Sequence, residues 1–281
     1  MARKALLVGI NRYRDPGADL RGCVNDVREM RDALVGLYGF AGPDVSILAD
    51  FEATKSAVQR GLESLVAGGR AGDVLVVHFA GHGSSVPDAS GDEEDFRDEI
   101  LCPTDLDWKD PLSDDWLRAL FDTTADGVNL TVVLDCCHSG TGTRASLPPD
   151  TTEPVERYLP CPLDIRPIEP DRALRGALRR ARRGLPGAAR PDDVRDADLP
   201  EIVLTGCRDD QTAADAYIDG DFHGALTHAL VSAMRDSAGV VTYRDLHARA
   251  KRLIGLALDQ APQLEGRAAR FDLPFLAPFG R

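Results

Sequence analysis

Two clusters in the sequence combine residue types that could serve as a nucleophile and its base. The first spans Val76–Ser84 (VVHFAGHGS) and the second spans Val132–Gly140 (VVLDCCHSG), and each begins as an apolar run typical of a buried strand. A cysteine is a strong nucleophile as a thiolate, and an imidazole such as His82 can accept its proton. The glycines beside His82 permit a sharp turn and offer N–H groups to a developing oxyanion. The pair of clusters therefore predicts Cys–His nucleophilic catalysis.

The second cluster contains adjacent cysteines, Cys136 and Cys137, and their spacing alone cannot identify the nucleophile. Neighbours on an extended strand point to opposite faces, so one of the two is expected to be a small buried hydrophobe. His78 lies inside an apolar run and is interpreted as a core residue, and His138 as a structural neighbour of the nucleophile. The remaining histidines show no metal-ligand spacing with one another, so no zinc site is expected: His223, His228 and His247.

Short apolar runs alternate with amphipathic helical patterns along the chain. Nearly continuous hydrophobicity predicts parallel strands, covered on both faces, at Ala5–Ile10, Val45–Leu48, Val74–Phe79, Leu130–Leu134 and Ile202–Leu204. Helical spacing predicts helices around residues 24–37, 58–66, 117–121, 225–234 and 243–258. The alternation predicts an α/β three-layer sandwich with a mostly parallel central sheet and helices on both faces. Because the carboxyl ends of parallel strands meet at one edge, the two clusters are expected to meet there.

The composition excludes several classes of function. The chain has 281 residues with 33 Lys+Arg and 46 Asp+Glu, a formal charge of -13, which disfavours nucleic acid as a partner. No apolar run approaches the length of a membrane span, and the run at Ala5–Ile10 is too short for a signal peptide. Six cysteines without paired metal spacing fit a reducing compartment, so we expect a cytoplasmic protein.

The charge is unevenly distributed along the chain. Residues 88–126 hold fourteen acids and three bases, a net charge of -11, whereas residues 166–190 hold eight arginines and two acids, a net charge of +6. The acidic segment could bind calcium, which takes roughly six to eight oxygen ligands. An EF-hand pattern fails there, because Glu93 stands where a glycine is required.

The residues around both clusters, together with other segments over nearly the whole chain, resemble the metacaspases, within the caspase-like cysteine peptidases. The segments that carry the resemblance are Leu6–Tyr13, Leu20–Asp26, Ala80–Ser84, Asp135–Gly140, Thr205–Ala213 and Gly224–Thr227. The match is to a type I-like member, and the Ala-, Arg- and Asp-rich usage indicates a bacterial source. The resemblance implies one caspase-like peptidase domain over residues 1–281. Its parts would be a large-subunit-like half (1–145), a Pro/Arg-rich linker or insertion (146–198) and a small-subunit-like half (199–281).

The resemblance also assigns roles at the site. The family places the nucleophile directly before a histidine, which implies Cys137 as nucleophile and His82 as general base. Gly83 and Cys137 would supply the N–H groups of the oxyanion hole, and amide hydrolysis would proceed through a thioester acyl-enzyme. Cys23, Asp26 and Asp135 match the substrate-binding positions, where carboxylates would select Arg or Lys before the cleaved bond.

Two features qualify the predicted specificity. Asp26 could instead act as a first-turn acid that favours the helix dipole. The family often has Ser where this chain has Ala80, which removes one hydroxyl from the region.

The resemblance further implies calcium activation through Asp98, Asp114 and Asp115. A further family acid is replaced around Thr143 and Arg144, which either removes one ligand or lets Arg144 substitute partly for the ion. The alternative is a solvated acidic loop.

If the pocket selects Arg, the exposed linker offers candidate self-cleavage sites at Arg172, Arg175, Arg179, Arg180, Arg182, Arg183 and Arg190.

The sequence therefore predicts a monomeric, cytoplasmic cysteine endopeptidase without an organic cofactor. Its partners would be proteins or peptides with exposed Arg or Lys, with no nucleic acid and no membrane. The alternative is a catalytically silent caspase-like scaffold or signalling module, which would need neither His82 nor Cys137. Preference for acidic residues is a further alternative, and it would require basic residues at positions 26 and 135.

Overall fold

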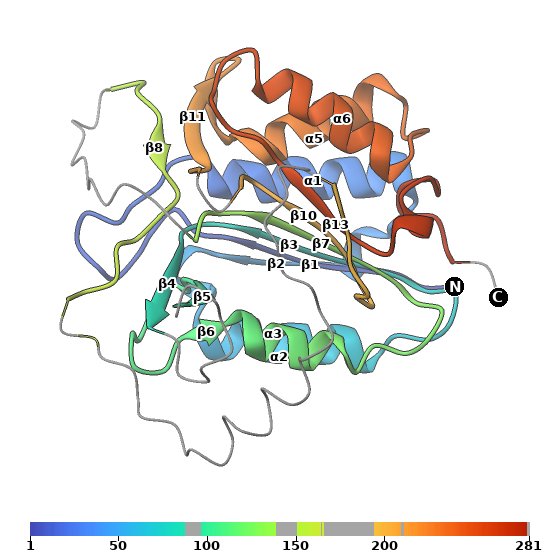
Figure 1. Cartoon of the computed structure of the whole chain (residues 1–281), viewed down its shortest axis with the longest axis horizontal. Helices are drawn as coiled ribbons and strands as arrows, with labels where there is room; N and C mark the ends of the chain where they lie inside the picture. The colour runs from blue at the N-terminus through green and yellow to red at the C-terminus, as the bar shows by residue number, and fades with distance from the viewer. Residues whose placement is uncertain (88–96, 139–150, 164, 166–193, 209–210, 280–281) are drawn as a thin grey trace.

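A computed structural model describes the chain except for residues 88–96, 139–150, 164, 166–193, 209–210 and 280–281 (Figure 1). A seven-stranded sheet with strand order β2-β1-β3-β7-β10-β13-β9 forms its centre. Five strands are parallel: β1 (Arg3–Gly9), β2 (Val45–Ala49), β3 (Val74–Ala80), β7 (Asn129–Asp135) and β10 (Ile202–Thr205). The antiparallel edge consists of β13 (Gln263–Gly266) and β9 (Val194–Asp196).

Helices cover both faces of this sheet. On one face lie α1 (Cys23–Tyr38), α5 (Ala225–Asp236) and α6 (Tyr243–Ile254), and on the other lie α2 (Lys55–Ala67) and α3 (Asp114–Phe121) (Figure 1). Successive side chains of β1 point to opposite faces of the sheet, so Leu6 packs in one hydrophobic cluster and Leu7 in the other. The predicted three-layer α/β sandwich is confirmed. Within the described chain, no helix is long and apolar enough to cross a membrane.

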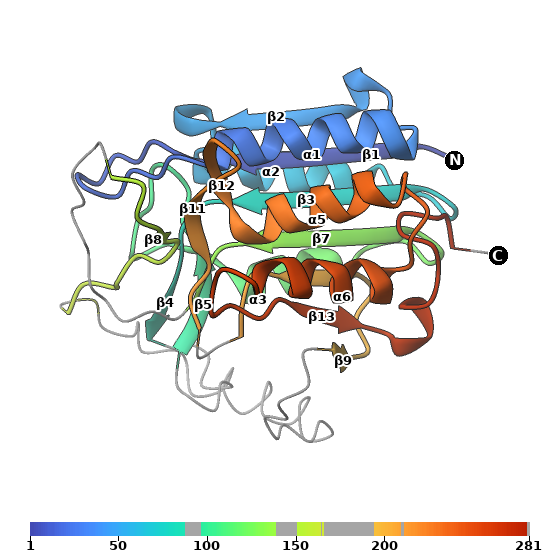
Figure 2. The same ribbon diagram turned by 90° about the horizontal axis from the view of Figure 1, so that it is seen from above.

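Two small antiparallel sheets lie beyond the carboxyl ends of the parallel strands (Figures 1 and 2). One contains β4 (Gly83–Pro87), β5 (Arg97–Leu101) and β6 (Leu112–Ser113), and the other contains β8 (Val155–Glu156), β11 (Ala214–Ile218) and β12 (Asp221–Gly224). Short 3-10 helices are η1 (Gly42–Asp44), η2 (Asp50–Glu52) and η3 (Ala268–Arg270). The sequence did not predict these small sheets, and they form the walls of the candidate site.

Local chemistry fixes the start of several helices. Side-chain oxygens of Thr54, Ser113 and Thr242 cap α2, α3 and α6 by accepting backbone N–H groups. The start of α1 lies directly against β1 at Gly9, where a Cβ would stand 2.5 Å from the Cys23 carbonyl oxygen. Glycine at this position therefore lets the first turn of α1, with Asp26, approach the end of the sheet.

Candidate active site

His82 and Cys137 emerge side by side from adjacent parallel strands. Ala80 of β3 pairs with Asp135 of β7. His82 lies two residues after Ala80, and Cys137 lies two residues after Asp135. Both side chains are buried, with exposed fractions of 3% for His82 and 1% for Cys137. The register of the sheet thus brings the two clusters to one edge, as the sequence predicted.

Hydrogen bonds orient the His82 ring and its backbone. Nε2 lies 2.8 Å from the carbonyl oxygen of Ala18, which can only accept, so Nε2 carries the proton and Nδ1 is the basic atom of the neutral ring. The backbone N–H of His82 donates to the Tyr13 hydroxyl at 2.8 Å, and the two rings lie 5.0 Å apart. The ring is therefore held in one tautomer.

The two adjacent cysteines point to different environments. Cys136 packs in the hydrophobic cluster beneath the sheet, and burial raises its thiol pKa well above the usual value. Cys137 instead contacts Cys207, whose Sγ lies 3.7 Å away, and its own Sγ accepts the N–H of Ala213. This contrast favours Cys137 as the nucleophile.

The other histidines near the site occupy structural positions. His78 is fully buried in β3, where its Nε2 lies 2.9 Å from Thr227 Oγ1, and burial lowers its pKa to about 4. His138 Nδ1 lies 3.3 Å from the Ser84 carbonyl oxygen.

The two backbone N–H groups predicted to bind an oxyanion converge on one carbonyl oxygen of the chain itself. Gly83 and Cys137 both donate to the oxygen of Arg157, at 3.0 and 3.2 Å. A Cβ at position 83 would overlap the Cys137 carbonyl, so glycine permits this close approach. The pair of donors therefore already holds a peptide carbonyl.

The side chain of Arg157 is fully buried in an acidic pocket. Its Nη2 lies 2.6 Å from Asp26 Oδ2 and 3.0 Å from Asp215 Oδ1, and its Nη1 lies 3.3 Å from Asp135 Oδ2. Nη1 also donates to the backbone oxygen of Asp135 at 3.1 Å. Asp26 and Asp135 thus lie together, and both contact a guanidinium.

The pocket shifts the pKa values of Asp26 and Asp135 in opposite directions. Burial alone would raise the pKa of Asp26, but the Arg157 guanidinium and further hydrogen bonds outweigh it and lower that pKa. Burial dominates at Asp135 and raises its pKa, although Thr227 donates to it through N–H and Oγ1. Cys23, the third predicted substrate-binding residue, is buried at the start of α1, where its N–H donates to Asn11.

Arg157 belongs to an extended segment, Val155–Leu159, here called the strap. Its first residues form β8, which pairs antiparallel with β11 through Glu156 opposite Ala214 and Val155 opposite Asp215. The N–H of Arg157 donates to the Ala213 carbonyl, and the N–H of Leu159 donates to the Gly83 carbonyl. The strap is therefore held by backbone pairing on both sides of Arg157.

Sequence reasoning missed Arg157 and Asp215. Arg157 lies inside the predicted linker but before its Arg-rich part. The apolar residues beside it, Val155, Tyr158 and Leu159, were the signal that this part of the linker is packed against the protein. Asp215 follows the Thr205–Ala213 segment by two residues, so extending that segment would have included it.

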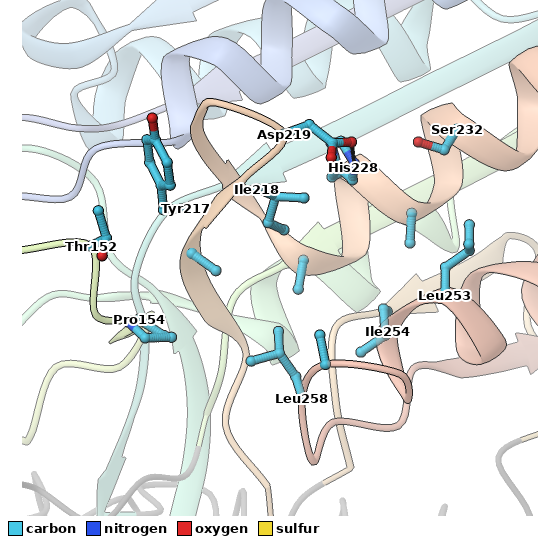
Figure 3. Close-up of a pocket in the computed structure, with 14 residues that line it drawn as sticks. Thr152, Pro154, Tyr217, Ile218, Asp219, His228, Ser232, Leu253, Ile254 and Leu258 are labelled. Carbon is cyan, nitrogen blue, oxygen red and sulfur yellow. Dashed lines mark ion pairs between the residues drawn. The ribbon is translucent and has the colours of Figure 1, made fainter.

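A mostly apolar cavity of about 460 Å³ lies next to the strap, between the β11–β12 hairpin, α5 and α6 (Figure 3). Thr152 and Pro154, which precede the strap, form one side of it, and Ile218, Leu253 and Leu258 form others.

The predicted calcium ligands occupy neighbouring segments. Asp98 lies on β5, and Asp114 and Asp115 begin α3 directly after β6, which pairs with β5 through Ile100 and Ser113. The seven candidate self-cleavage arginines lie outside the described residues.

Comparisons with known proteins agree with this geometry. A family model described as "Metacaspase, peptidase C14 domain" matches residues 3–145. Metacaspase-1 of Scheffersomyces stipitis is 30% identical over 93% of this chain and 70% of its own length.

Solved structures agree as well. The crystal structure of a Geobacter sulfurreducens protein superimposes with a TM-score of 0.68 at 26% identity, covering 100% of both chains. Caspase-1 from Spodoptera frugiperda gives a TM-score of 0.55 at 10% identity over 94% of this chain and 90% of its own, which shows the caspase-like fold alone. The chain belongs to the metacaspases, a family of caspase-like cysteine peptidases.

Proposed function

We propose that this metacaspase hydrolyses peptide bonds after arginine or lysine through a thioester on Cys137. One observation carries the proposal: the chain places its own Arg157 in the acidic pocket while the carbonyl of that residue accepts two N–H groups beside Cys137. A substrate needs both contacts at the residue before the cleaved bond.

The steps follow from the positions of these groups. His82 Nδ1 takes the proton of the Cys137 thiol, and Sγ attacks the carbonyl carbon, whose oxygen becomes an anion. The N–H groups of Gly83 and Cys137 stabilise that oxyanion. The C–N bond breaks as His82 protonates the leaving amine, and water then hydrolyses the thioester.

The pocket supports preference for arginine over lysine. Two nitrogens of one guanidinium reach three carboxylates and a backbone oxygen, whereas an ammonium is a single point charge. A substrate with lysine in place of arginine would therefore make fewer of these contacts.

The same docking supports self-processing, and we propose Arg157–Tyr158 as a further candidate bond, upstream of the seven linker arginines. While the strap occupies the pocket and the two N–H donors, it excludes other substrates from them. Cleavage or displacement of the strap would free the site.

Calcium activation remains part of the proposal. Asp98, which is 8% exposed, offers hard oxygen ligands together with Asp114 and Asp115, and this donor set fits Ca²⁺. β5 pairs with β4, whose first residue is the oxyanion donor Gly83, so an ion at these residues could order that donor. We further propose a cytoplasmic monomer, in keeping with the charge and cysteine content.

The test is hydrolysis of fluorogenic Arg, Lys and Asp peptides by wild type and Cys137→Ala, with calcium and with a chelator. We expect activity on Arg peptides, less on Lys, none on Asp, and none with Cys137→Ala. Preference for Asp peptides would refute the pocket assignment. Hydrolysis of none of the peptides would favour a scaffold instead.

A further inference from the structure

Three side chains converge outside the catalytic dyad. They come from three neighbouring elements, α1, β12 and α5, whose arrangement Figure 2 shows. Glu29 comes from α1, His223 from β12 and His228 from the first turn of α5, and one donor atom from each lies within 4.8 Å of the others. The imidazole rings lie 5.1 Å apart. We propose that these residues form a binding site for a divalent transition-metal ion of the zinc type.

The first argument is that this cluster holds buried polar atoms whose hydrogen-bonding capacity is not used. Among the described residues, none forms a hydrogen bond with the buried atoms Glu29 Oε2 and His228 Nδ1. His223 Nδ1 also faces Asp26 Oδ1 of the acidic pocket, at 3.6 Å. Oε2 and the Nδ1 of His223 lie 4.0 Å apart. Buried polar atoms normally have partners, and two unused ones beside an imidazole indicate a ligand.

The second argument is the orientation of His228. Its other ring nitrogen, Nε2, lies 3.3 Å from Asp219 Oδ2, and Figure 3 shows these two side chains beside each other. A carboxylate on Nε2 fixes the proton there and leaves a lone pair on Nδ1. Histidines that bind metals commonly have this carboxylate on the nitrogen away from the metal.

Glu29 is oriented in the same way. Its Oε1 lies 3.6 Å from Arg235 Nη1, which leaves Oε2 for the histidine side. Two imidazoles and one carboxylate suit zinc, whereas calcium prefers oxygen ligands only. Ligand atoms around tetrahedral zinc lie about 3.4 Å apart, so the side chains close by roughly 1.5 Å at most when the ion binds.

The experiment uses the full chain with Cys137→Ala, at about pH 8, which lies above the ordinary pKa of an imidazole. Zn²⁺ binding is measured by calorimetry, and the ligand type by the absorption spectrum with Co²⁺. We expect one tight equivalent and a Co²⁺ spectrum without a thiolate charge-transfer band.

Variants distinguish Zn²⁺ binding at this cluster from Zn²⁺ binding by the remaining cysteines. His228→Ala and Glu29→Gln should weaken Zn²⁺ binding at least tenfold, and Asp219→Asn, at an exposed carboxylate, about tenfold or more. Glu63→Gln, an exposed glutamate on α2, is the matched control for Glu29→Gln and should change nothing. Absence of binding, unchanged affinity in His228→Ala and Asp219→Asn, or a thiolate band in the Co²⁺ spectrum would each refute the proposal.

Discussion

Arg157 contributes to the site through both its side chain and its backbone carbonyl. Its guanidinium is the cation that lies among Asp26, Asp135 and Asp215, all buried, while its carbonyl occupies the two N–H donors beside Cys137. A buried ion pair gains little over an apolar replacement, but removing one partner leaves the other charges uncompensated. The arginine is therefore expected to stabilise the fold, and under the proposed function it is also the residue before a bond that the enzyme cuts.

Arg157→Gln tests this double role. In the Cys137→Ala chain, which cannot cut itself, we expect the free energy of unfolding to fall by about 3–5 kcal/mol, because three carboxylates lose their cation. Arg60→Gln, at an exposed position on α2, should have almost no effect. Urea denaturation measures both.

With Cys137 intact, amino-terminal sequencing of fragments should find a start at Tyr158 in wild type and not in Arg157→Gln. Equal stability of the two Cys137→Ala chains would contradict the structural role of the arginine. Fragments starting at Tyr158 in Arg157→Gln would contradict the docking argument.

The sequence could predict some residues of the site but not others. His82 and Cys137 stand at the ends of apolar runs, so strand pairing alone brings them together. Asp26 and Asp135 were found by resemblance to the family. Arg157 and Asp215 depend on pairing between β8 and β11, and such long-range pairing leaves no periodic signal in short strands.

At the scale of elements, the junction between β12 and α5 forms the inner wall of the acidic pocket. The N–H of Gly224 donates to both oxygens of Asp26 at 3.0 Å, and α5 begins directly after it. A Cβ at position 224 would overlap Arg157 Nη1 and Asp135 Oδ2. Glycine here makes room for a guanidinium.

Gly224→Ala should therefore weaken binding of arginine in the pocket. We expect kcat/KM for Arg peptides to fall at least tenfold, which corresponds to about 1.4 kcal/mol or more. Gly36→Ala is the matched control, because a Cβ there meets nothing within 4 Å and lies on the exposed face of α1. Unchanged kcat/KM in Gly224→Ala would show that the pocket wall is placed differently.

Helices and strands with buried, continuously apolar residues were easier to predict than short strands of small and polar residues. Within the described residues, the five long apolar strands and the five α-helices were all predicted, although α6 ends at Ile254 rather than 258. The strands β4 (GSSVP), β11 (ADAYI) and β13 (QLEG) were missed, because small and polar residues replace the continuous apolar run. Their pairing partners, rather than their own composition, make them strands.

At the scale of the whole molecule, a chain of hydrogen bonds connects the core of the sheet with the pocket. His78 Nε2 lies 2.9 Å from Thr227 Oγ1, which in turn donates to Asp135 Oδ2 at 2.7 Å. Because the hydroxyl proton goes to the carboxylate, His78 donates to the oxygen. Because burial lowers its pKa to about 4, His78 is neutral in the native core at neutral pH.

This core predicts acid sensitivity of the fold. Burial lowers the pKa of His78 from 6.5 to about 4 in the folded state, so between these values only the unfolded chain binds this proton. Unfolding free energy should thus fall as pH drops from about 6.5 to about 4, by roughly 3 kcal/mol in total from this residue.

Replacement of His78 by asparagine, which cannot titrate, should remove that part of the pH dependence. Urea denaturation of Cys137→Ala chains with and without His78→Asn, from about pH 7 to pH 4.5, measures the difference. Parallel curves over this range would show that His78 does not titrate as described.

The strap has a consequence for how the enzyme is regulated. An arginine that is covalently part of the chain acts as a tethered competitor, whose effective concentration is set by the lengths of chain beside it and is about millimolar for short flexible tethers. Dilution of the protein cannot lower that concentration, so a free peptide must exceed it before it fills the pocket. If the Arg157–Tyr158 bond is cut as proposed, the new carboxyl end would stay attached to the segment before it and would act as a product inhibitor. Activity would then depend on how far that end can move away, in addition to the cut itself.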